Sequence, residues 1–192
     1  MFVYSNYTVT GGLFKGPGDI LLDTGSTLTN FVYNGEGSVR SFRTGVMVSN
    51  GHIFSTTGGL IVSSGAGASN VTVKCSGSGI AIINSSKISN CEGYSVGSVG
   101  IYSTTSGDAD GVFNCFGYSN GSYGIQISRG ICYNSVGRST GGSGIWTDLR
   151  NNPDIVNCVG WSSSGPGIYC HSSGTTGKFV NCYAESGLDT TL

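Results

Sequence analysis

Four aspartates are the residues of this sequence whose type and spacing could support catalysis. Asp108 and Asp110 lie in one short insertion, and Asp148 and Asp154 lie in another. Two carboxyl groups about 5–10 Å apart are what most glycosidases use to cleave a glycosidic bond. Both insertions follow the same point of an internal repeat, so they are expected to emerge on one edge of the protein. A glycan-cleaving or cation-binding edge is therefore one interpretation of these aspartates.

Turn formation is the simpler interpretation of the same four residues. Asp is common in turns because its side chain hydrogen-bonds the nearby backbone, and no second catalytic motif accompanies these aspartates. His52 and His171 are far apart in the sequence, and no serine or cysteine has the surroundings of a nucleophile. No Cys and His residues have the spacing of zinc ligands. The sequence therefore favours a protein without catalysis, metal or other cofactor.

Two sets of aromatic and polar residues recur at fixed places in the repeat, and they are candidates for contact with a glycan or a protein partner. Aromatic rings can stack on sugar faces, and Arg and Gln can hydrogen-bond hydroxyl groups. Shielding of a sheet or contact with another protomer is favoured over sugar binding, because apolar patches usually mark interfaces. The first set is Tyr94, Tyr118, Arg138 and Trp161, followed by Glu185, and the second set is Tyr102, Gln126, Trp146 and Tyr169.

The repeat that positions these residues has the frame Asn-Cys-x-Gly/Ala-x-Ser, followed by Gly-Ile. The steps between successive asparagines are 24, 20, 23 and 24 residues, whereas the Asn-to-Gly distance is 10 residues in every full copy. A fixed block with a variable spacer indicates stacked units with insertions at one corner. The copies begin at Asn90, Asn114, Asn134 (with Ser135 in place of the Cys), Asn157 and Asn181.

Earlier asparagines continue the ladder at 20-residue steps. Gly79-Ile80 follows Asn70, and Gly59-Leu60 follows Asn50, each at nearly the repeat distance. No such glycine pair follows Asn30, so whether Asn30 belongs to the repeat stays open. We therefore assign residues 50–192 to the repeats, and residues 1–49 to an N-terminal cap or docking segment with the first irregular rungs.

Alternation within each copy predicts short strands rather than helices. The residue two before the Asn is apolar and the residue after it is small, so two inward positions flank the Asn, three residues apart. The Asn is therefore expected to occupy a bend with a left-handed backbone. Stacked units place like residues one strand spacing apart, about 4.8 Å, so ladders of like side chains should run along the molecule. No segment has helical periodicity.

Composition excludes several classes of function. The chain has 34 glycines, 10% charged residues and a net charge of −1, without the basic patch that nucleic-acid binding requires. No apolar run could span a bilayer, and the N-terminus lacks the features of a signal peptide. Seven cysteines, an odd number, then indicate buried thiols in a reducing compartment.

The frame Asn-Cys-x-Gly/Ala-x-Ser with Gly-Ile, at steps of 20 to 24 residues, resembles the right-handed parallel β-helix of the pectate-lyase-like superfamily. The resemblance covers about residues 50–192. It implies an all-β, single-stranded right-handed parallel β-helix (solenoid) of about six to eight rungs with an irregular N-terminal cap. The superfamily includes cell-wall lyases, polysaccharide epimerases and bacteriophage tailspikes, so the motif specifies the fold more than the activity.

The charge-poor surface, rich in Gly, Ser, Thr and Asn, is most similar to bacteriophage tailspike and tail-fibre members. This resemblance implies a virion structural protein, namely a spike, tail fibre or decoration element, assembled in the host cytoplasm and exposed on the virion surface. The expected partners are other copies of the chain, with a homotrimer favoured, other virion proteins, and a bacterial surface polysaccharide. Two alternatives stay open: a polysaccharide lyase or glycoside hydrolase of the same superfamily, and a secreted, extracellular bacterial adhesin.

Overall fold

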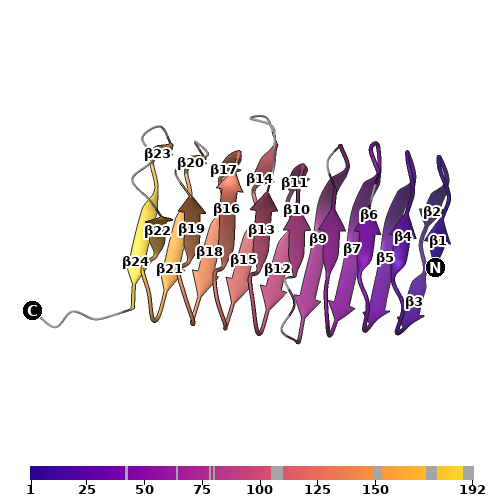
Figure 1. Ribbon diagram of the computed structural model, residues 1–192, viewed down its shortest axis with the longest axis horizontal. Helices are drawn as coiled ribbons and strands as arrows, with labels where there is room; N and C mark the ends of the chain where they lie inside the picture. Colours follow the sequence, from indigo (N-terminus) through magenta and orange to yellow (C-terminus); the bar gives the residue numbers. More distant parts are fainter. Residues whose placement is uncertain are drawn as a thin grey trace, which may run out of the picture.

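The computed structural model describes residues 1–41, 43–63, 65–77, 79, 81–104, 110–148, 153–171 and 177–187. These residues form a parallel β-solenoid of about eight turns (Figure 1). The described part of the chain contains no helix, and hence none long and apolar enough to cross a membrane. The prediction of an all-β solenoid of six to eight rungs is confirmed.

One wall of the solenoid is a parallel sheet that we call sheet A. Its strands pair in the order of the chain, and its inward side chains are mostly aliphatic, such as Ile101, Ile125 and Ile145, which are fully buried. The strands are β1 (Phe2–Val3), β4 (Ile20–Leu22), β6 (Val39–Ser41), β8 (Leu60–Val62), β10 (Ile82–Asn84), β13 (Ile101–Thr104), β16 (Ile125–Arg129), β19 (Ile145–Asp148) and β22 (Ile168–His171).

The pairing of sheet A corrects one detail of the repeat alignment. The residue that pairs with Ile101 is Ile82, and Ile82 pairs in turn with Leu60. The alignment of Ile80 with the repeat isoleucines is therefore wrong by two residues. The turn that precedes β10 is longer than the asparagine spacing indicates.

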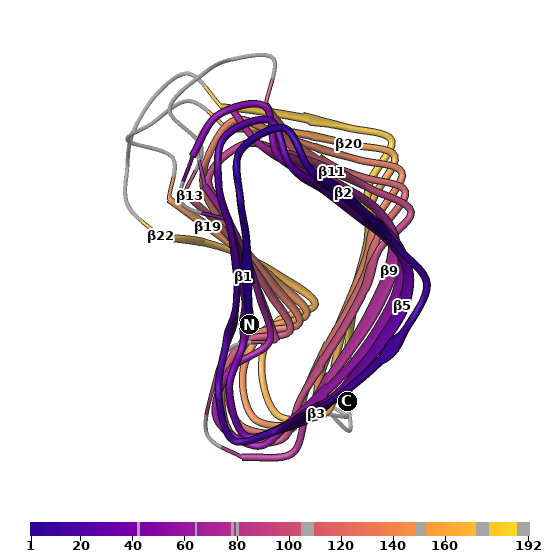
Figure 2. The same cartoon turned by 90° about the vertical axis from the view of Figure 1, so that its right-hand side faces the viewer.

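Sheet B forms the rest of the wall and bends into two arms along the asparagine ladder (Figure 2). Three long strands run through the bend: β5 (Thr27–Gly35), β7 (Met47–Ser55) and β9 (Gly67–Cys75). The other strands of the first arm are β2 (Thr8–Thr10), β11 (Lys87–Ser89), β14 (Gly111–Phe113), β17 (Ile131–Tyr133), β20 (Asp154–Val156) and β23 (Lys178–Val180). Those of the second arm are β3 (Leu13–Gly16), β12 (Glu92–Ser95), β15 (Phe116–Ser119), β18 (Val136–Ser139), β21 (Val159–Ser162) and β24 (Tyr183–Ser186).

The bend has the left-handed backbone that the sequence predicts. Neighbouring side chains hydrogen-bond each other along the ladder, from Asn70 Nδ2 to Asn50 Oδ1 at 3.0 Å and from Asn114 Nδ2 to Asn90 Oδ1 at 3.3 Å. Asn tolerates this backbone better than other residues with a side chain. The φ angles lie between 48° and 55° at Asn30, Asn50, Asn70, Asn90, Asn114, Asn134, Asn157 and Asn181.

Residues 1–49 contribute strands to the same two sheets. Strands β2 and β3 pair in parallel with β5, and β1 pairs with β4. Asn30 adopts the ladder conformation with a φ of 54°. The ladder therefore extends one rung earlier than the repeat frame alone indicates.

The repeat serine forms the turn that follows strands β12, β15, β18 and β21 of the second arm. Ser119 Oγ accepts hydrogen bonds from the backbone N–H groups of Gly121 at 3.1 Å and Ser122 at 2.9 Å, and it donates to the carbonyl of Ser98. Ser139 and Ser162 make the same bonds in their own turns. One hydroxyl thereby satisfies backbone groups of two rungs, which explains its place in the frame.

The two repeat glycines bring sheet A close to the second arm of sheet B. A Cβ on Gly117 would overlap the carbonyl oxygen of Gly124, and one on Gly137 would overlap that of Gly144. The later rungs are drawn inward at this point in Figure 2. Gly117 and Gly137 must be glycine because backbone occupies the space that a side chain would take.

Candidate functional site

The structure places the two predicted sets of contact residues on different sheets. The first set lies on the outer face of the second arm of sheet B, and the second set lies on the outer face of sheet A. They therefore form two separate surfaces rather than one site.

The sheet-B row is a continuous ladder in strict register. Lys74 Nζ lies 5.7 Å from the ring centroid of Tyr94, the rings of Tyr94 and Tyr118 lie 6.2 Å apart, and the guanidinium carbon of Arg138 lies 4.4 Å from the centroid of Trp161. Cation–π contacts and paired rings hold these side chains against the sheet. The row consists of Lys74, Tyr94, Tyr118, Arg138, Trp161 and Glu185.

A second outward ladder runs beside the sheet-B row, two residues earlier on each strand. The ring of Phe116 lies 5.6 Å from that of Tyr94, and the Tyr94 hydroxyl donates a hydrogen bond of 3.2 Å to Glu92. Burial, together with the nearby Glu92 carboxylate, raises the pKa of Tyr94, so its phenol stays protonated at neutral pH. This neighbouring row consists of Thr72, Glu92, Phe116, Val136, Val159 and Tyr183.

A hollow of about 380 Å³ opens beside the first residues of the sheet-B row, at Lys74, Tyr94 and Tyr118. Its walls include Lys74, Tyr94, Val96, Tyr118 and Asn120. The Tyr118 hydroxyl donates a short hydrogen bond of 2.6 Å to Asn120 Oδ1. The hollow therefore combines ring edges, an ammonium group and an amide at the start of the row.

The sheet-A row carries a stack of rings that crosses three rungs. Trp146 lies between Tyr123 and His171, with centroid distances of 5.6 Å to each and interplanar angles of 23° and 28°. The register places Gln126 beside Trp146 and Trp146 beside Tyr169. Two rings that do not recur in the repeats, those of Tyr123 and His171, therefore join the sheet-A row. That row consists of Tyr102, Gln126, Trp146 and Tyr169.

The sequence did not identify Tyr123, His171 and Lys74 as parts of these rows. Tyr123 and His171 occupy positions where the other repeats have no aromatic residue, so no recurrence marks them. Lys74 precedes the first full copy of the frame. The register of the sheet connects Lys74 with its row, and ring contacts with Trp146 connect Tyr123 and His171 with theirs.

The three candidate carboxylates that the structure describes lie on separate elements. Asp110 immediately precedes β14 and Asp154 opens β20, two rungs further on. Asp148 ends β19 in sheet A and is only 6% exposed. Asp108 lies outside the described residues. Within those residues, no cluster of three His, Cys, Asp or Glu side chains could hold a metal ion.

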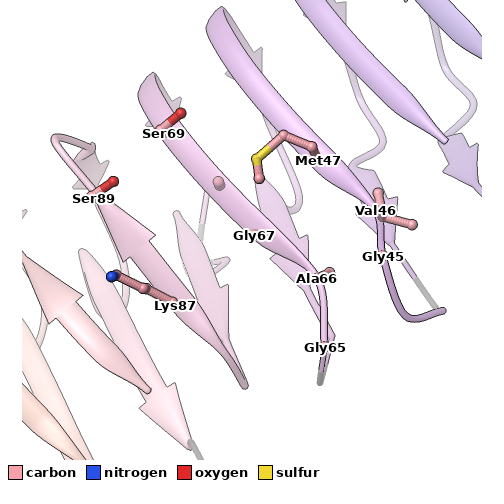
Figure 3. A pocket seen from close by; sticks show the side chains of 10 residues that line it. Gly45, Val46, Met47, Gly65, Ala66, Gly67, Ser69, Lys87 and Ser89 are labelled. Atoms are coloured by element: carbon pink, nitrogen blue, oxygen red, sulfur yellow. The ribbon is translucent and has the colours of Figure 1, made fainter. Parts of the chain in front are cut away.

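A shallow pocket of about 450 Å³ lies on the first arm of sheet B (Figure 3). Met47 and Lys87 flank Gly67, whose missing side chain creates the depression, and Ser69 and Ser89 lie on one side. The Lys87 ammonium lies 4.9 Å from the ring centroid of Phe113. The mainly apolar lining offers few groups that could orient a ligand.

The cysteines are free thiols, and five of the seven are buried. The Sγ atoms of Cys132 and Cys158 lie 3.6 Å apart and share a hydrogen bond. This hydrogen bond and burial hold the pKa of Cys132 well above the usual value of a thiol. The hydrogen bond with Cys91, with burial, also raises the pKa of Cys115. These two thiols stay protonated in the core and are therefore not nucleophiles.

Comparison with protein-family models, with curated proteins and with solved structures found no match to this chain. The function therefore has to be inferred from the outer faces of the two sheets. Each presents rings held in place by neighbouring rungs, which is an arrangement suited to binding rather than to bond cleavage.

Proposed function

We propose that this chain is a non-enzymatic binding rod that holds a carbohydrate polymer along the outer face of sheet A. The observation that supports this function best is the stack of Tyr123, Trp146 and His171 across three successive rungs. Because Trp146 is stacked between the other two rings, the rims of the three rings form a continuous apolar strip for the C–H groups of sugars, while Gln126 can hydrogen-bond hydroxyl groups. A linear polymer that lies along the solenoid can contact several rungs at once.

The proposed biological setting is a virion. The resemblance to bacteriophage spike and fibre proteins supports a structural element exposed on the virion surface, whose ligand is a polysaccharide of the bacterial host. A rod with a binding face that repeats along its length suits such a polymer, because weak contacts at each rung add up when they are linked.

Binding to a panel of bacterial capsular and O-antigen polysaccharides tests the proposal. The wild-type protein is expected to bind at least one member of the panel without shortening it. Trp146→Ala should weaken that binding about tenfold, corresponding to about 1.4 kcal/mol, because the central ring of the stack is lost. The measurement is isothermal titration calorimetry, with chain length of the glycan followed by gel filtration.

Trp161→Ala is the matched control, since it removes the same side chain from sheet B. It should leave glycan affinity unchanged. The proposal is wrong if no polysaccharide binds, or if both substitutions weaken binding equally. Shortening of the glycan would instead support the lyase or hydrolase alternative.

A further inference from the structure

The sheet-B row has a charge pattern that complements itself when it is reversed. Its six positions from β9 to β24 run from the cation Lys74 to the anion Glu185, with Tyr94 and Trp161 one step inside each end, and the register continues beyond Lys74 to Phe54. The two central residues are an aromatic ring and a cation, Tyr118 and Arg138. Read backwards, the row therefore offers a chemically suitable partner at every position.

We propose that the second arm of sheet B binds a second copy of this chain face to face, with the two solenoids antiparallel. The required two-fold axis lies parallel to the strands, between β15 and β18. Such an axis reverses the order of the rungs but keeps each position along the strand, so one row faces the same row of the other copy. Lys74 then faces Glu185 of the second copy, Tyr94 faces Trp161, and Tyr118 faces Arg138. Such an isologous contact is the commonest arrangement in homodimers.

The neighbouring row supports the same arrangement. At the axis, Phe116 of one copy faces Val136 of the other beside the pair of Tyr118 and Arg138, and one step out Glu92 faces Val159. Tyr183, which is 58% exposed, faces the small Thr72. Aromatic residues and Arg at the centre, with other charged residues at the rim, are typical of protein interfaces.

Charge selects this register among its neighbours. Moving the axis half a rung onto β18 would set Arg138 against itself, and moving it half a rung the other way, onto β15, would leave Glu185 opposite Phe54. A further half-rung shift towards the N-terminus sets Lys74 against Arg138, and the next sets Glu92 against itself. Like charges held opposite each other disfavour three of these arrangements, and the axis on β15 leaves the Glu185 carboxylate without a facing cation. Only the axis between β15 and β18 pairs Lys74 with Glu185.

The shape of the face is also suitable. The strands of the second arm lie side by side as one layer (Figure 1). The hollow beside Lys74, Tyr94 and Tyr118 lies where Trp161 and Glu185 of the second copy arrive. In the described part of the chain, the ion pairs found are Arg40–Asp19 and Arg43–Asp23, so Lys74 and Glu185 are available for an intermolecular pair.

The expected affinity is modest. The face covers six rungs, or about 24 Å at one strand spacing per step, and interfaces of this small size are usually weak and reversible. This inference goes beyond the proposed glycan binding and is independent of it, since sheet A stays uncovered in the dimer.

A charge exchange between two variants tests the proposal. In Lys74→Glu, each contact would place the introduced carboxylate against Glu185 of the other copy. In Glu185→Lys, each contact would place the introduced ammonium against Lys74 of the other copy. Each variant alone should therefore dimerise at least tenfold more weakly than the wild type in sedimentation equilibrium. An equal mixture allows dimers with one copy of each variant. In such a dimer, one contact joins the introduced carboxylate to the introduced lysine, and the other joins Lys74 to Glu185. Both contacts pair opposite charges, so dimerisation should be restored.

Lys87→Glu is the matched control, because Lys87 is also an outward lysine over an aromatic ring but lies on the first arm of sheet B. It should leave the wild-type dimer intact. Circular dichroism checks that every variant keeps its β structure. The proposal is overturned if the wild type stays monomeric up to about 1 mM, far above the range of weak specific contacts, if it forms a trimer, or if mixing the two variants fails to restore the dimer.

Discussion

At the scale of single residues, position in the rung decides what each cysteine can do. Cys91, Cys115 and Cys158 follow the ladder asparagines and are buried between rungs, whereas Cys170 lies in the last strand of sheet A and is exposed. The alternation of the sequence predicts buried thiols after the asparagines. It does not predict the sulfur contact between Cys132 and Cys158, because these residues occupy different positions of the repeat.

Alkylation of the native protein should therefore modify Cys170 before any buried cysteine. Partial burial raises the pKa of Cys170 above the usual value of 9.0, and only the thiolate reacts. The rate at neutral pH should be lower than that of a free thiol, and it should keep increasing with pH above 9. Peptide mass spectrometry after labelling with iodoacetamide measures both effects. Early labelling of Cys91, Cys115 or Cys158 in the folded protein would contradict this account of the core.

At the scale of the elements, the rung is what the sequence predicts best. The Asn bend, the inward isoleucine and the two outward rows each recur at a fixed distance, so their stacking follows from the repeat. The position of β10 could not be predicted in the same way, because the turn before it differs in length and the spacing from Asn70 no longer identifies the isoleucine. The tight approach of the two repeat glycines also needed the structure, since the sequence does not show which backbone faces them.

Gly117→Ala should lower the free energy of unfolding by about 1–3 kcal/mol, because the added methyl group has to displace the backbone of Gly124. Gly18→Ala is the control: nothing lies within 4 Å of the added Cβ. It should be neutral or slightly stabilising, since alanine restricts the unfolded chain. Urea unfolding followed by circular dichroism compares the two. Equal stabilities for both variants would contradict the close approach of sheet A and sheet B.

At the scale of the whole molecule, the solenoid separates the two candidate surfaces by placing them on different sheets. Alternation along the strands identified most of both rows, and so the candidate surfaces could largely be predicted from the sequence. Their separation could not, because the fold of each rung in space decides which row belongs to which sheet. The two proposals are therefore compatible, because glycan binding needs one face and dimerisation needs the other.

The chain has two tryptophans, and one lies on each surface: Trp146 in β19 and Trp161 in β21. Fluorescence of the single-tryptophan protein Trp161→Phe therefore reports on the stack of sheet A alone. Its emission should change in intensity and wavelength when the polysaccharide that the wild type binds is added. Emission of the Trp146→Phe protein should not respond to that polysaccharide. A response of Trp161 alone, or of neither tryptophan to any member of the panel, would contradict the claim that sheet A is the glycan-binding face.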